Sequence, residues 1–78
     1  MVVTVVGKAH FSGVSQKSGR AYDFIQLHYV APADRVEGNA AVVGSMSPSL
    51  YPYSDIQPGF EYNLEYDRDG RIIGFSAA

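Results

Sequence analysis

Residues 60–66, FEYNLEY, alternate without exception between a large apolar or aromatic side chain and a polar one. A period of two is typical of a β-strand with one face on a core and the other in solvent, and it does not suit a helix. The following DRDG ends in a glycine that can adopt positive φ, as hairpin turns require. Residues 71–76 are therefore predicted to return as a strand, with Ile73 and Phe75 on one face and Ile72 and Gly74 on the other. The apolar set of the first strand is expected to face inward: Phe60, Tyr62, Leu64 and Tyr66.

The N-terminal segment is rich in β-branched residues, which predicts a strand over residues 2–11. Gly7 interrupts this strand and indicates a bulge or a sharp bend. Lys8 and His10 are expected on a solvated face. The opposite face is expected to carry Val3, Val5, Gly7, Ala9 and Phe11.

Two further strands are predicted over residues 21–30 and 40–46, and a loop over residues 12–19, which hold three serines and two glycines. Residues 47–58 contain three prolines and form an irregular connection, with one helical turn near residues 49–51. From this connection, four apolar side chains are expected to close one end of a barrel: Leu50, Tyr51, Tyr53 and Ile56.

The five predicted strands occur as a meander, a crossover and a final hairpin, with no convincing amphipathic helix between them. In a chain of 78 residues this pattern favours a single all-β domain over residues 1–78, a small five-stranded antiparallel barrel of the oligonucleotide-binding (OB) type. An SH3-like barrel is the alternative. Because a domain this small is marginally stable and has no cysteine for disulfides, association with a second copy is expected.

The candidate functional surface lies within residues 12–30. The odd positions of the second strand, Ile25, Leu27 and Tyr29, suit a core. The even positions form an unusually aromatic solvent face that includes Tyr22, Phe24 and His28, and the preceding loop carries Lys17 and Arg20. Cations beside exposed rings suit a ligand with phosphates and stacked bases, which predicts nucleic-acid binding.

A different interpretation is that the aromatic face is buried against a subunit or a protein partner. Lysine is depleted from the cores of such interfaces, so the neighbouring Lys17 favours the nucleic acid. The net charge of −2 does not suggest a nucleic-acid binder. The distribution of charge gives some support, because residues 1–30 carry three cations and one carboxylate, whereas residues 31–78 carry three cations and seven carboxylates.

Catalysis is not expected. His10 and His28 are the only histidines, and neither has the spacing to a partner that a metal site or a nucleophile would require. No cofactor or metal is predicted. No apolar run approaches the length of a membrane span, so a cytoplasmic protein is expected.

Three short motifs lie in this region: Ser12-Gly13-Val14-Ser15, Gly19-Arg20-Ala21-Tyr22 and Tyr29-Val30. Together they resemble the early segment of the gene V-type single-stranded DNA-binding, helix-destabilising proteins of filamentous bacteriophages. The resemblance implies an OB barrel that works as a homodimer and coats single-stranded DNA during replication in a bacterial host. By position, it implies phosphate contacts from Arg20 and from Lys17 or Gln16.

The same resemblance implies that Tyr22 and Tyr29 face DNA and that Phe24 makes an apolar contact. Phe11 stands where the family has a cation. The expectation is thus sequence-independent binding of single-stranded DNA, with RNA as a further ligand of the same surface. The predicted contact residues are Lys17, Arg20, Tyr22, Phe24, His28 and Tyr29.

Overall fold

The computed structural model describes all 78 residues and consists of five antiparallel strands in one sheet. The strands are β1 (Val2–Val14), β2 (Ala21–Ala31), β3 (Ala40–Met46), β4 (Glu61–Tyr66) and β5 (Ile72–Ala77), and one 3-10 turn, η1 (Tyr53–Asp55), lies between β3 and β4. The predicted all-β class and its five strands are therefore confirmed. The only helical element is this three-residue turn, and no helix is long or apolar enough to cross a membrane.

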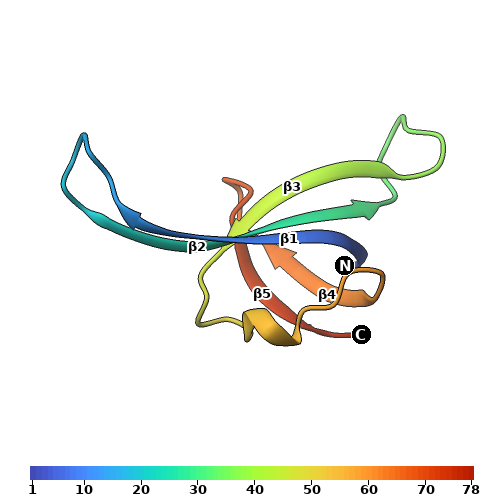
Figure 1. Ribbon diagram of the computed structural model, residues 1–78. Coiled ribbons are helices and arrows are strands. Elements are labelled where there is room, and N and C mark those ends of the chain that lie inside the picture. Colours follow the sequence, from blue (N-terminus) through green and yellow to red (C-terminus); the bar gives the residue numbers. More distant parts are fainter.

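The sheet has the order β3-β2-β1-β4-β5, so β1 is central and β3 and β5 are the edges (Figure 1). The edges come together at one point, where a Cβ on Gly44 would lie 3.1 Å from Cδ1 of Ile72. They do not pair through their backbones. A barrel closes only when its last two strands pair. The sheet is therefore not closed into the predicted barrel but remains open along the seam between β3 and β5.

The β1–β2 hairpin extends well beyond the rest of the sheet (Figure 1). β3 pairs with β2 only from Ala31 back to Ile25, and β4 pairs with β1 only at Val2–Thr4. The remaining residues, Phe11–Phe24, form a two-stranded ribbon with a turn at its tip, which we call the arm. Its strands include part of the segment predicted as a loop, because Ser12, Gly13 and Val14 continue the pairing of β1 with β2.

A bulge in β1 exchanges the two faces of that strand. The pairing with β2 shifts register between Val5 and Gly7, which confirms the irregularity predicted at Gly7. Beyond the bulge, Lys8 and His10 lie on the core side, opposite Leu27 and Ile25. The single face predicted for Val3 through Phe11 is therefore wrong, because an extra residue turns every following side chain to the other side.

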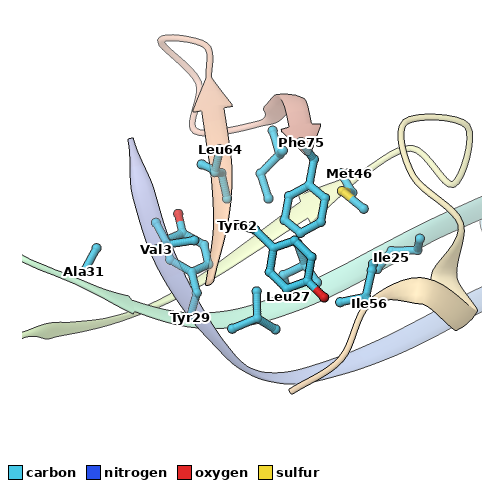
Figure 2. Packing of buried hydrophobic residues seen from close by; sticks show 12 residues of the cluster. Val3, Ile25, Leu27, Tyr29, Ala31, Met46, Ile56, Tyr62, Leu64 and Phe75 are labelled. Atoms are coloured by element: carbon cyan, nitrogen blue, oxygen red, sulfur yellow. The ribbon is translucent and has the colours of Figure 1, made fainter. Parts of the chain in front are cut away.

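The core lies between the inner face of β1–β3 and the β4–β5 hairpin (Figure 2). Tyr62 and Phe75 stack at 4.8 Å, and Tyr51 packs edge-on against both rings. The connection before β4 covers one end of this core, as predicted, although its helical turn lies at Tyr53–Asp55 rather than near residues 49–51. Ile56 is buried, and three partly buried side chains pack on the cluster: Leu50, Tyr51 and Tyr53.

The predicted inward faces of β4 and β5 are only partly correct. Tyr62 and Leu64 are buried, but Phe60 and Tyr66 are 58% and 55% exposed. Phe60 precedes the first residue of β4, and Tyr66 lies at the other end of the strand, beside the open seam. A second register shift, between Glu65 and Tyr66, explains why β5 buries both Ile72 and Phe75 and leaves Ile73 exposed.

The turn that joins β4 to β5 has the predicted form. Gly70 has a φ of 82°, and its N–H donates to the Asp67 carbonyl oxygen at 3.0 Å. Oδ1 of Asp67 accepts hydrogen bonds from the backbone N–H groups of Asp69 and Arg71. The DRDG segment is therefore a hairpin turn that is closed by its own first side chain.

Candidate nucleic-acid interface

Three aromatic rings form a continuous strip on the outer face of the arm, the side of β1 and β2 that points away from the core. The rings of Phe11 and Phe24 stack at 5.3 Å with planes 25° apart, and Tyr22 follows at 6.2 Å from Phe24. Phe11 is 43% exposed and Tyr22 is 44% exposed. Each ring of this aromatic strip therefore has a neighbour on the protein and surface open to solvent.

The alternation of β2 and the bulge of β1 together create the strip. On β2, Ile25 and Leu27 are fully buried, which turns Tyr22 and Phe24 outward. On β1, the shift at Gly7 brings Phe11 to the same side, directly opposite Phe24. Sequence reasoning missed Phe11 as a site residue, although Gly7 was the signal that would have moved it to this face.

Two cations lie at the tip of the arm, where β1 turns into β2. The turn is closed by the N–H of Ser15, which donates to the Arg20 carbonyl oxygen at 2.9 Å, and Gly19 adopts a φ of 68°. Lys17 and Arg20 are exposed, and neither has a carboxylate partner, since the only ion pair in the molecule joins His10 and Asp23. Their charges are therefore available to an anion.

The charged and polar contacts of the β1–β2 hairpin lie on its inner side, and its outer face has no carboxylate. Asp23, the one acidic residue in the first thirty, accepts a hydrogen bond from Nε2 of His10 on the inner side. Near the base of the arm, Nζ of Lys8 donates to the Tyr53 carbonyl oxygen at 2.6 Å and lies 4.1 Å from the centre of the Tyr53 ring. Lys8 thus connects β1 to η1, and it is not available on the outer face.

His28 lies on the same outer face, beyond the aromatic strip. Its ring covers Gly7, where an added Cβ would meet the His28 side chain at 3.6 Å, and its neighbour on β3 is Val43. Gln26, paired with Ala9, separates His28 from Phe24. The outer face therefore continues from the arm onto the three-stranded part of the sheet.

Tyr29 is not part of this surface. It lies on the core side of β2 and is only 6% exposed. Burial raises the pKa of its phenol above the ordinary value, and the neighbouring Tyr66 raises it further. The structure thus brings together five of the six predicted contact residues on the arm and the outer face of β2, and it excludes Tyr29.

An apolar pocket of about 280 Å³ opens at the seam between β3 and the β4–β5 turn. Tyr29 and Tyr66 line it together with Ala31, Ala40 and Val42, and no charged side chain is among its walls. The structure contains no group of three histidine, cysteine or acidic side chains that could hold a metal ion.

Comparisons of the chain with protein-family models, curated proteins and solved structures returned no match. A functional assignment therefore has to be argued from the geometry of the arm.

Proposed function

We propose that the protein binds single-stranded nucleic acid, foremost single-stranded DNA, on the outer face of the arm and without sequence preference. The observation that carries this proposal is the aromatic strip of Tyr22, Phe24 and Phe11 beside two unpaired cations, Lys17 and Arg20. Every base has a flat π-face, so exposed rings bind any base, while the cations neutralise phosphates. No carboxylate on this face opposes a polyanion.

Stacking supplies most of the binding free energy in this proposal. A stacked base contributes about 1–3 kcal/mol, so two or three rings outweigh the contribution of a few phosphate contacts. With so few cations on the arm, binding should depend only weakly on salt, corresponding to about two or three phosphates per subunit. A slope of log affinity against log salt concentration steeper than about −5 per subunit would contradict this dominance of stacking over phosphate contacts.

The biological role in the proposal is that of a helix-destabilising protein in the replication of a phage or plasmid, in the cytoplasm of a bacterial host. Its support is the resemblance noted above, because Ser12–Ser15 and Gly19–Tyr22 are the residues that form the arm and its turn. The same proposal includes a homodimer. The apolar, exposed Val42 and Tyr66 lie at the seam, and Val42 is on the side of β3 opposite the outer face, so a second copy that binds there leaves the rings accessible.

The test uses the six tyrosines of a protein without tryptophan. Tyrosine emission is followed during titration with oligo(dT) and with oligo(U), at low salt and again at about 0.2 M salt. Saturable quenching that persists at the higher salt supports base stacking on Tyr22. A flat titration with both oligonucleotides would exclude the proposal.

The alternative function is a protein-interaction module in which the aromatic strip is a subunit or partner interface. Tyr22→Ala separates the two. Nucleic-acid binding predicts a loss of oligonucleotide affinity with an unchanged sedimentation coefficient. An interaction module predicts altered assembly and no effect of oligonucleotides on either protein.

A further inference from the structure

Tyr22 lies across the neighbouring strand, over a residue that has no side chain. Its cross-strand partner is Gly13, and a Cβ added to Gly13 would lie 2.9 Å from the Tyr22 hydroxyl oxygen and 3.2 Å from Cζ. The first distance is shorter than a Cβ contact can be, so any side chain at position 13 would displace the phenol ring.

The backbone does not explain why position 13 is a glycine. The glycines with positive φ are Gly19, Gly38, Gly59 and Gly70, and Gly13 is not among them. An alanine could adopt the backbone of Gly13 without strain. What an alanine could not do is leave room for Tyr22 in its present place.

The other glycine on the outer face of β1 provides a contrast. A Cβ on Gly7 would meet the His28 side chain at 3.6 Å, which is ordinary van der Waals contact. Gly7 therefore tolerates a methyl group beside its ring, and Gly13 does not. The steric requirement is specific to the position that faces Tyr22.

We propose that Gly13 is a positioning residue for ligand binding: by lacking a side chain, it allows the Tyr22 ring to lie across β1, in line with Phe24 and Phe11, with one face open to a base. This inference rests on the proposed function. The nearest atoms of Tyr22 are at the far end of a flexible side chain, so a methyl group at position 13 moves the ring and not the strands. The ring then loses its alignment with Phe24, and the fold is unchanged.

The experiment compares Gly13→Ala with Gly7→Ala, in oligo(dT) titrations and in thermal unfolding. Gly13→Ala should weaken binding about tenfold, within the range expected for one stacked base, and should not lower the unfolding midpoint. Gly7→Ala should bind within about twofold of the wild type. Equal losses in both variants, or wild-type affinity in Gly13→Ala, would overturn the inference.

A rescue distinguishes positioning from a general effect on the strand. Tyr22→Phe keeps the ring and removes the oxygen that lies 2.9 Å from the added Cβ. Combined with Gly13→Ala, it should restore affinity to within about threefold of Tyr22→Phe alone. If the double variant binds as weakly as Gly13→Ala, the contact with Tyr22 is not the cause.

If the wild type binds no oligonucleotide, the proposed function is wrong, and the position of the Tyr22 ring over Gly13 is then tested by a separate measurement. A ring lying over Gly13 shifts the Gly13 Hα resonances upfield in the NMR spectrum, and Tyr22→Leu should abolish that shift. Gly13→Ala should move the Tyr22 ring resonances, while Gly7→Ala should not. Hα resonances at ordinary positions in the wild type would show that the ring does not lie there.

Discussion

The two halves of the β1–β2 hairpin have the same alternating pattern and opposite surroundings. In the half that joins the sheet, η1 and the β4–β5 hairpin cover the inner face of β2, and Ile25 and Leu27 are fully buried. In the arm, no other strand pairs with either β1 or β2, and Phe11 and Tyr22 remain exposed. One half provides the core of the fold, and the other presents side chains to solvent.

The comparison shows that an aromatic side chain acquires its role from what covers its strand. Tyr62 and Phe75 stack in the core, where their burial stabilises the protein. Phe11 and Phe24 stack at 5.3 Å on the arm, where Phe11 is exposed and Phe24 is half-buried. Changes in the two halves should therefore separate stability from binding.

The largest expected effect is on stability, from truncation in the covered half. Leu27→Ala removes a fully buried side chain and leaves a cavity, which should lower the free energy of unfolding by about 2–5 kcal/mol. A domain of this size has little stability in reserve, so the variant should be substantially unfolded at moderate urea concentrations. The measurement is urea denaturation followed by circular dichroism. Val43→Ala, at an exposed site, is the control, and an equal loss there would remove the distinction between the halves.

The next effect is on binding, from truncation in the arm. Tyr22→Ala removes one ring of the strip and should lower oligo(dT) affinity by about 5- to 150-fold, the equivalent of one stacked base. The free energy of unfolding should change by less than about 0.5 kcal/mol because the site is exposed. Phe60→Ala removes a ring that is also exposed but lies outside the arm, and it should bind normally. If both variants lose affinity alike, binding does not depend on the position of the ring.

A pair of lysines allows a finer comparison. Lys8→Met removes the hydrogen bond and the cation–π contact to Tyr53, and it should cost about 1 kcal/mol of unfolding free energy. Lys17→Met, at the exposed tip, should leave stability unchanged and reduce the log–log salt slope of binding by about 0.7. Denaturation and salt titrations of both variants test whether Lys8 affects stability and Lys17 affects binding. Identical behaviour of the two lysines would contradict it.

The smallest effect concerns alkaline stability. Burial raises the pKa of Tyr29 in the folded protein, so above pH of about 10 the unfolded chain releases this proton more readily than the folded one. The contribution of Tyr29 is therefore fully present below that pH and is lost as the pH rises through the folded-state pKa. Tyr29→Phe should unfold with a weaker dependence on pH in this window. A pH dependence that is unchanged in Tyr29→Phe would show that another group is responsible.

Local patterns were sufficient for much of the fold. The inward direction of Tyr62 and Leu64 in β4, the DRDG turn and the limits of β3 at Ala40 and Met46 were all correct from the sequence. The outward direction of Tyr22 and Phe24 was also correct, because Ile25 and Leu27 on the same strand require a core. These features are set by residues that are close together in the sequence, so the sequence alone is sufficient to predict them.

The errors concern contacts between distant segments. The bulge before Gly7 was visible in the sequence, but the side on which Phe11, Lys8 and His10 emerge depends on the register with β2. The open seam, which leaves Tyr66 exposed, depends on β3 and β5 failing to pair. Tyr29 was placed on the binding face by resemblance, against its own position in the alternation, and the structure follows the alternation.

A periodic sequence therefore specifies which side chains of a strand share a face, since backbone geometry repeats every two residues. Which face is covered, and where a strand has no neighbour at all, depends on pairing and packing between residues that are far apart in the chain. In this protein, alternation alone separates Tyr29 in the core from Tyr22 on the outer face of β2. The register between β1 and β2 decides that Phe11 lies opposite Phe24 and joins the aromatic strip.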